Sequence, residues 1–186
     1  NKQKVIFAHN LDYDNFIKIN KKIVLNSKEK NLLFLDEDFP CHSDYERSGL
    51  SPNVNEDNYF KEISNCLNSI GDKFKLKPFI KLHPRANYEK SKSSYYVKVK
   101  DGDTAELILQ SDLIVAHCST AIQLAVLFYK PLILIKPNEL SEFSPWYSTI
   151  ERFCKLLDVQ SFKSKDIREL KIFPQVNRKK YNLYIE

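Results

Sequence analysis

The sequence predicts an α/β fold in which a parallel sheet carries helices on both faces. Three apolar segments of strand length occur between residues 79 and 135, and helix-length segments separate the later ones. This alternation is typical of parallel sheets, because each helix returns the chain to the end of the sheet from which the next strand starts. Ligands of such sheets bind beyond the carboxyl ends of the strands, so residues that directly follow a strand are the first candidates for function.

Short apolar runs bounded by polar or turn-forming residues predict the individual strands. These runs cover residues 5–8, 31–36, 79–82, 95–99, 113–116 and 132–135. Apolar residues at helical spacing, or a capping residue before them, predict the helices. The helices cover residues 59–70, a segment that begins at Asp103 or Thr104, residues 119–129, 149–157 and 165–170, and Gly71 is expected to stop the first of them. Residues 12–22 show no clean period, and the tail from residue 171 is basic and aromatic.

Length and composition favour one domain without a nucleic-acid partner. The chain has 186 residues and a net charge of +5, from 29 lysines and arginines against 24 acidic residues, and the basic residues are scattered. We expect an N-terminal arm or linker over residues 1–30, the α/β domain over 31–160, and a C-terminal helix with a basic tail over 161–186. The chain contains no methionine, even at position 1, so we also expect it to be a piece of a longer polypeptide.

Two further exclusions follow from residue patterns. No apolar run approaches the roughly 18 residues of a membrane-spanning helix, and no signal peptide precedes the first elements, so a cytoplasmic location is expected. The four cysteines lie far apart without CxxC pairing and are expected to be free thiols. No metal site is predicted. The cysteines are Cys41, Cys66, Cys118 and Cys154.

Ser119 and Thr120 follow an apolar strand and precede a predicted helix. Such a position brings unpaired backbone N–H groups, the positive end of the helix dipole and two hydroxyls together, which suits a phosphate. A purely structural role for Ser119 as the helix cap is equally consistent with the sequence. No glycine-rich loop accompanies the pair, so neither a P-loop nucleotide triphosphatase nor a dinucleotide dehydrogenase is supported.

Two histidines and an arginine also follow predicted strands. Pro84 restricts His83 to extended geometry, which holds its imidazole at the strand end, where it can bond or protonate a phosphate leaving group. Arg85 can clamp an anion, although a solvated surface arginine is as consistent with the pattern. His117 is either a phosphate ligand or a hydrogen-bonded core histidine, and the apolar strand before it slightly favours the core.

Asp36, Glu37 and Asp38 follow the strand at residues 31–36 and form the acidic cluster nearest a predicted strand end. Carboxylates there can act as a general base or accept hydrogen bonds from sugar hydroxyls. A solvated turn is the alternative interpretation. The long polar loop over residues 41–55 begins beside this strand end, and long loops in such positions often carry function.

Two motifs together resemble a known family. They are KLHP at residues 81–84 and SDLIVAHCSTA at residues 111–121, the second followed by YKP at residues 129–131. They are similar to the C-terminal, nucleotide-binding domain of bacterial GT-B glycosyltransferases that build capsule and lipopolysaccharide. Within that group the HP and Ser/Thr motifs resemble those of sialyl- and polysialyltransferases, capsule Kdo transferases and CDP-glycerol polymerases. The resemblance covers roughly residues 75 to 140.

The resemblance implies a Rossmann-like sheet that forms one half of a GT-B fold, and a role for each matching residue. His83 would assist departure of the nucleotide, while Ser119 and Thr120 would bind the donor phosphate. The implied enzyme is an inverting glycosyltransferase without metal or cofactor that uses a nucleotide-activated sugar, with a CMP-sugar favoured. Its glycan or glycolipid acceptor would bind an N-terminal domain outside this chain.

Such an enzyme works in the cytoplasm, and peripheral association with the inner membrane is left open. The alternatives are a non-catalytic Rossmann-like nucleotide-binding or interaction module and a domain like those of nucleotide-sugar epimerases.

Overall fold

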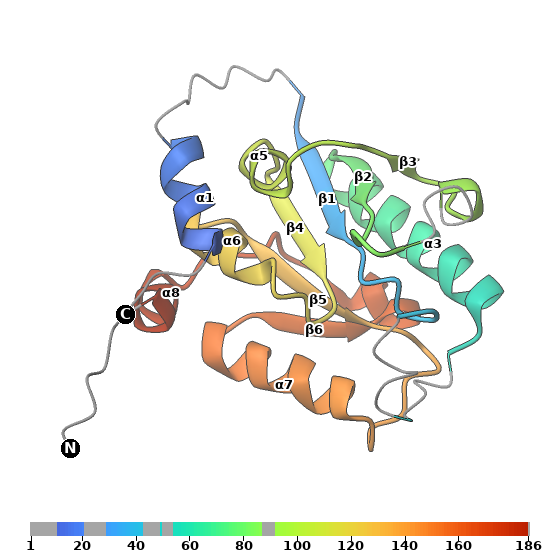
Figure 1. The fold of residues 1–186 in the computed structure, drawn as a ribbon. Helices are drawn as coiled ribbons and strands as arrows, with labels where there is room; N and C mark the ends of the chain where they lie inside the picture. Colours follow the sequence, from blue (N-terminus) through green and yellow to red (C-terminus); the bar gives the residue numbers. More distant parts are fainter. Residues whose placement is uncertain (1–10, 21–28, 43–48, 50–53, 87–91, 186) are drawn as a thin grey trace.

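A single parallel sheet forms the centre of the molecule. The computed structural model describes residues 11–20, 29–42, 49, 54–86 and 92–185. Within these ranges six strands pair in the order β3-β2-β1-β4-β5-β6, and every neighbouring pair is parallel. Helices lie on both faces of the sheet (Figure 1). The α/β class and the parallel sheet predicted from the alternating pattern are confirmed.

The bounds of the elements are close to those expected from the sequence in the centre of the sheet and differ more at its edges. The strands are β1 Asn31–Leu35, β2 Lys77–Lys81, β3 Lys98–Val99, β4 Leu113–Ala116, β5 Leu132–Lys136 and β6 Gln160–Lys163. The helices are α1 Leu11–Asn20, α3 Glu56–Phe74, α5 Thr104–Leu109, α6 Ile122–Leu127, α7 Pro145–Leu157, the 3-10 helix η1 Ser164–Glu169 and α8 Arg178–Ile185.

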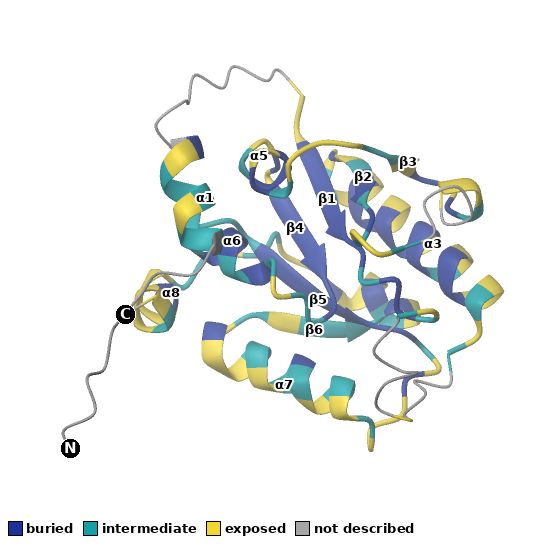
Figure 2. Cartoon of the chain, in the orientation of Figure 1, coloured by how far each residue is buried: buried dark blue, intermediate teal, exposed yellow. Residues whose placement is uncertain are grey.

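The apolar runs form strands because both faces of the sheet are covered. All side chains of β1, β4 and β5 are buried (Figure 2). A strand buried on both faces needs a continuous apolar run, whereas a strand with one wet face alternates. The run at residues 113–116 therefore predicts β4 with its correct bounds.

The direction of each crossover places the helices. The connection from β1 to β2 steps one way along the sheet, and the connection from β4 to β5 steps the other way. Because crossovers between parallel strands are right-handed, α3 and α6 must lie on opposite faces. Helix α3 packs against η1, whereas α6 packs against α1 and α8, and α8 continues the layer to α7.

Helix α3 is longer than the apolar pattern predicts. It begins after Asn55, whose side chain accepts a hydrogen bond from the Asn58 N–H at 3.0 Å. The predicted stop at Gly71 is wrong, because the helix continues to Phe74 and ends at Lys75 in the left-handed conformation. The Lys75 backbone N–H bonds the Gly71 carbonyl, so Gly71 belongs to the last turn.

Three elements were not predicted from the sequence. Helices α1 and α8 have little amphipathic character, and α8 has a single buried side chain, that of Tyr181. Strand β6 has the polar sequence QSFK and pairs only with β5. It crosses residue 160, where we expected the α/β domain to end. The strand predicted at residues 5–8 lies outside the described residues.

No helix in the described ranges combines the length and the apolar character needed to cross a membrane.

Candidate functional site

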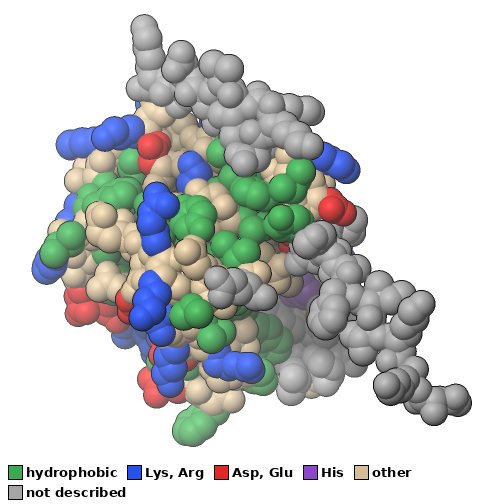
Figure 3. All heavy atoms as spheres, turned by 90° about the vertical axis from the view of Figure 1, so that its left-hand side faces the viewer, with side chains coloured by type: hydrophobic (Ala, Val, Ile, Leu, Met, Phe, Trp, Pro, Cys, Tyr) green, Lys and Arg blue, Asp and Glu red, His purple; other side chains and the backbone are tan. Residues whose placement is uncertain are grey.

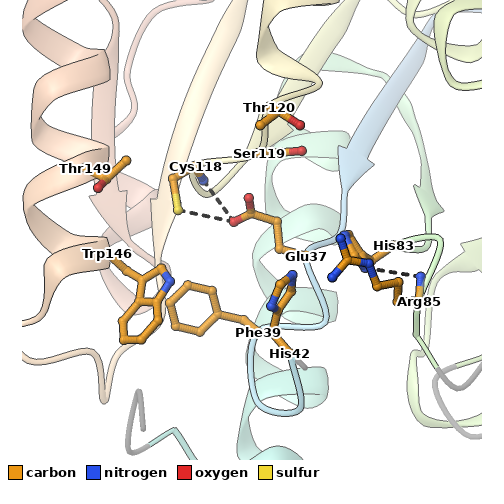
Figure 4. Close-up of a pocket in the computed structure, with 10 residues that line it drawn as sticks. All are labelled: Glu37, Phe39, His42, His83, Arg85, Cys118, Ser119, Thr120, Trp146 and Thr149. Carbon is orange, nitrogen blue, oxygen red and sulfur yellow. Dashed lines mark hydrogen bonds between the residues drawn. The ribbon is translucent and has the colours of Figure 1, made fainter. Parts of the chain in front are cut away.

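The strand order reverses between β1 and β4, and a pocket of about 380 Å³ lies at this point. Parallel sheets bind their ligands at such a switch point, because the connections leave the two neighbouring strand ends in opposite directions and open a crevice. It is lined by residues that follow β1, β2 and β4 and by two residues near the start of α7 (Figure 4). They are Glu37, Phe39, His42, His83, Arg85, Cys118, Ser119, Thr120, Trp146 and Thr149.

Of the acidic cluster after β1, only Glu37 lines the pocket. Asp36 and Asp38 are buried away from it, with 3% and 7% of their surfaces exposed. Of the three expected carboxylates, these two therefore do not face this pocket, because the chain turns sharply after the strand. Asp38 has a positive φ of 50°, and its carbonyl accepts a hydrogen bond from Cys41.

Glu37 spans the gap between β1 and β4. Its Oε2 accepts hydrogen bonds from the Cys118 backbone N–H at 3.0 Å and from the Cys118 thiol at 3.4 Å. Burial raises the pKa of Glu37 to about 7, although the hydrogen bonds from Cys118 act in the opposite direction. A carboxyl group with such a pKa exchanges its proton near neutral pH, as a general base must. Burial also raises the pKa of the Cys118 thiol, which argues against a nucleophilic thiolate.

His83 and Arg85 follow β2 and lie on the other side of the pocket, next to His42 (Figure 4). The His83 Nδ1 accepts a hydrogen bond from the Arg85 backbone N–H at 3.2 Å. Because Nδ1 accepts a hydrogen bond, a neutral His83 ring carries its proton on Nε2. The Nε2–H group can then donate a hydrogen bond to a phosphate oxygen. The rings of His42 and His83 are 4.9 Å apart. The pocket therefore brings two imidazoles and a guanidinium to one wall.

Ser119 and Thr120 line the pocket, but neither caps α6. The helix begins at Ile122, and Ala121 occupies the cap position without a side-chain hydrogen bond. The expected cap is wrong because residues 119–122 form a turn before the helix, in which the Ile122 N–H bonds the Ser119 carbonyl at 3.1 Å. The Ser119 hydroxyl accepts the Ala121 N–H at 3.2 Å within this turn.

His117 lies in the core and not in the pocket. It is fully buried, its Nδ1 lies 2.5 Å from the Ile135 carbonyl oxygen, and its Nε2 lies 2.9 Å from the Tyr59 hydroxyl. Burial lowers the pKa of His117 to about 4, so the ring is neutral at physiological pH. Both ring nitrogens therefore have partners inside the protein, which is the arrangement that the core interpretation predicts, and His117 does not line the pocket.

A buried polar network lies beneath the pocket and joins the ends of β1 and β4. The Asp36 Oδ1 accepts hydrogen bonds from the Tyr95 hydroxyl at 2.9 Å and the Asp38 N–H at 3.1 Å, and it lies 3.2 Å from the Tyr59 hydroxyl. Burial raises the pKa of Asp36 to about 6. The Tyr59 hydroxyl also contacts His117. One hydroxyl on α3 therefore links Asp36, which precedes Glu37, to His117, which precedes Cys118.

Comparison with known proteins identifies the architecture. No protein-family model and no curated protein sequence matches the chain. Two structures of the wall teichoic acid polymerase TagF are similar to it, one with a histidine-to-alanine substitution (TM-score 0.51, 15% identity) and one soaked with CDPG (TM-score 0.50, 14% identity). The chain has one half of a GT-B fold. Each alignment covers 94% of this chain but only 42% and 40% of the TagF chains, so the chain spans about two fifths of their length.

A structure of UDP-GlcNAc 2-epimerase from Methanocaldococcus jannaschii is also similar, with a TM-score of 0.48 and 14% identity over 92% of this chain and 48% of that chain.

The pocket also contains residues that were not singled out from the sequence. His42, Phe39, Cys118, Trp146 and Thr149 line it. The Phe39 and Trp146 rings meet edge to face with centroids 6.1 Å apart, and together they form an aromatic wall. His42 lies in the long loop that was expected to be functional. For Trp146 and Thr149 the sequence offered only a weak indication. The two residues are three positions apart on α7 and therefore share one face of that helix.

Among the described residues, no group of three or more histidine, cysteine, aspartate or glutamate side chains is placed to hold a metal ion. The pocket nevertheless contains several hydrogen-bond donors that suit an anion.

Proposed function

We propose that the chain is the donor-binding half of a metal-independent, inverting glycosyltransferase that acts in bacterial surface polysaccharide biosynthesis, of the capsule or lipopolysaccharide type. A nucleotide-activated sugar is the donor, and a CMP-sugar is favoured. The observation that carries this proposal is the convergence of His83, Arg85, Ser119 and Thr120 on one pocket at the switch point of the sheet.

These donors suit a phosphate from opposite sides. His83 and Arg85 reach it from the end of β2, while the hydroxyls of Ser119 and Thr120 reach it from the turn after β4. In the proposed reaction, negative charge grows on the phosphate as the bond to the sugar breaks. The His83 Nε2–H stabilises that charge or protonates the leaving group, and Arg85 and the hydroxyls hold the phosphate in place. No metal ion or other cofactor has a role in this scheme.

Glu37 has two roles consistent with its position. Its pKa of about 7 allows it to take a proton from an acceptor hydroxyl near neutral pH. It can equally accept a hydrogen bond from a sugar or ribose hydroxyl. The half-buried Trp146 ring, which packs edge to face on the buried Phe39, offers a surface on which a nucleobase or a sugar can pack. Asp36 is buried in the core and does not line the pocket.

The donor and the acceptor would bind different parts of the enzyme. TagF is named as a polymerase and was soaked with CDPG, which supports a cytidine donor for this chain. The glycan or glycolipid acceptor would bind a second domain beyond these 186 residues.

We also propose a cytoplasmic enzyme that associates peripherally with the inner membrane. Figure 3 shows lysine and arginine side chains spread among hydrophobic ones on the left-hand side of Figure 1. Leu156 on α7 and Leu183 on α8 are exposed by 52% and 61%. Anionic lipid head groups suit such a mixture of cations and apolar side chains.

Titration with a nucleotide panel tests the proposal. We expect CMP or CDP, and more weakly UDP, to shift the backbone amide NMR signals of Ser119 and Thr120. Affinity should be weak, because half of a two-domain cleft covers only part of the ligand. EDTA should leave the affinity unchanged, whereas a loss restored by magnesium would contradict a metal-independent site. No binding by any nucleotide at millimolar concentration would instead favour a non-catalytic interaction module.

A further inference from the structure

A second pocket of about 300 Å³ lies between α3 and η1 and shares no residue with the first. Its size is at the lower end of the range for small-molecule sites. On one side, Glu62, Asn65, Cys66 and Ser69 line it. They occupy positions i, i+3, i+4 and i+7 of α3, so the helix presents them as one stripe.

Two cations line the opposite side of this pocket. Lys165 and Arg168 are both exposed and lie three residues apart in η1. In a 3-10 helix, residues at this spacing stand directly above one another, so both side chains leave from the same side of η1. With Glu62 as the only acidic residue in the lining, the charged groups sum to a net positive site that suits an anion.

The lining of the pocket includes the buried hydroxyl of Ser164, next to Glu62. Ser164 lines the pocket with 5% of its surface exposed; its Oγ makes no hydrogen bond of regular geometry, but it lies close enough to the Glu62 carboxylate to lower the pKa of that group. The nearby Glu62 carboxylate is already engaged by Asn138, through the backbone N–H at 3.0 Å and Nδ2 at 2.6 Å. A ligand hydroxyl that bonds the Ser164 Oγ would complete the hydrogen bonding of this buried group.

We propose that this second pocket binds an acidic sugar residue. Ring hydroxyls bond Ser164 and the side chain of Asn65, and a carboxylate or phosphate on the sugar pairs with Lys165 and Arg168. The pocket takes Asn138 from the segment after β5 and Ser164 from the start of η1, directly after β6, so it lies at the same edge of the sheet as the first pocket. Under the proposed function, this sugar belongs to a part of the acceptor glycan that extends from the second domain onto this chain. That assignment rests on the proposed function, whereas the chemistry of the site does not.

NMR titration of the 186-residue chain with four probes tests the proposal. Glucuronic acid and glucose 6-phosphate should shift the amide signals of Asn138 and Lys165, while glucose and inorganic phosphate should bind at least about tenfold more weakly. Binding of only one of the two acidic sugars supports the proposal and assigns the charged group. Equal binding of inorganic phosphate and glucose 6-phosphate would show a plain anion site, and no shift with either acidic sugar would overturn the proposal.

Two variants separate recognition from stability. Arg168→Gln should weaken binding of the acidic sugars about tenfold. Ser164→Ala should weaken it as well, while leaving the melting temperature of the unliganded chain nearly unchanged, because the hydroxyl that it removes makes no hydrogen bond of regular geometry. A lower melting temperature with unchanged affinity would show that Ser164 is structural and would overturn its role.

Arg152→Gln on α7 is the matched control, since Arg152 is exposed and lines neither pocket. Nucleotide binding at the first pocket is measured separately, through the amide signals of Ser119 and Thr120. A negative result at one pocket therefore does not change the result at the other.

Discussion

His83 and Ser119 face the same pocket but offer different groups to a phosphate. His83 can place a proton on Nε2, whereas Ser119 already accepts the Ala121 N–H and offers its own hydroxyl proton. A group that meets charge growing in the transition state affects turnover, and a group that holds the ground-state phosphate affects binding.

Under the proposed function, His83→Ala in the full-length enzyme should lower kcat by about 10² to 10⁴ with a smaller effect on donor affinity. Ser119→Ala should mainly raise the donor KM, by the equivalent of about 1 to 3 kcal/mol. Steady-state kinetics of both variants measures the difference. Cys154→Ala is the control, because this half-buried thiol lines neither pocket and should affect stability more than turnover. A folded His83→Ala enzyme with wild-type kcat would show that the imidazole is structural.

Glu37 makes the stability of the chain depend on pH. Burial raises its pKa from 4.5 to about 7, so the folded state binds the proton more readily than the unfolded state. Its contribution to the free energy of unfolding is therefore full below about pH 4.5 and is lost as the pH rises to about 7. His117 acts in the opposite direction, because its lowered pKa favours the folded state as the pH rises from about 4 to 6.5.

Glu37→Gln keeps an oxygen that can accept the Cys118 N–H but has no proton to lose. We expect the variant to unfold with the same free energy as the wild type at pH 4.5 and to be more stable by about 1 to 3 kcal/mol at pH 8. Urea unfolding at the two pH values measures this difference, and the contribution of His117 cancels between the two proteins. Glu106→Gln on α5 is an exposed control. An equal difference at both pH values would mean that Glu37 does not titrate in this range.

At the scale of the element, α3 shows how packing overrides a local signal. A glycine after an apolar stripe usually ends a helix, yet Gly71 lies inside the last turn. The chain folds back directly over it: a Cβ at this position would lie 2.8 Å from the Leu76 carbonyl oxygen and 3.2 Å from Pro78 Cδ. Glycine is needed here for the close approach of the segment that enters β2.

Gly71→Ala should therefore destabilise the chain by about 1 to 3 kcal/mol, although alanine is the better helix former by about 1 kcal/mol. Chemical denaturation monitored by circular dichroism measures the change. Asn68→Ala, at an exposed position of the same helix, should change the stability by no more than about 0.5 kcal/mol. A stabilised Gly71→Ala variant would show that the Leu76 carbonyl can move away.

At the scale of the whole molecule, one core joins all the layers. The buried cluster includes Ile19 of α1, the strands β1, β4 and β5, Leu67 of α3 and Tyr181 of α8. Elements that share one core unfold together, because none can expose its apolar face without exposing that of a neighbour. The segments at both ends of the described chain therefore belong to the same cooperative unit.

We expect two-state unfolding in urea. Trp146 is the only tryptophan and lines the first pocket, so its fluorescence reports on the site while circular dichroism reports on the sheet and helices. The two transitions should coincide in midpoint and slope. A fluorescence transition at lower urea than the circular dichroism transition would contradict the prediction and show that α7 and the pocket open first.

Much of the fold followed from the sequence alone. Strands buried on both faces require continuous apolar runs, and β1, β4 and β5 have them. The sequence also predicted that the candidate side chains lie close together, because strand ends in a parallel sheet meet at one edge. Five of them line one pocket: His83, Arg85, Ser119, Thr120 and Glu37.

Only the tertiary structure decided which of the candidate side chains face the pocket. Glu37 points into it while Asp36 turns into the core, and His117 pairs with Tyr59 and the Ile135 carbonyl. Trp146 reaches the site from α7, more than 100 residues along the chain from Glu37. These outcomes depend on contacts between residues far apart in sequence. A local pattern specifies whether a segment forms a strand or a helix, whereas the direction of a side chain beyond a strand end depends on the neighbours that packing brings to it.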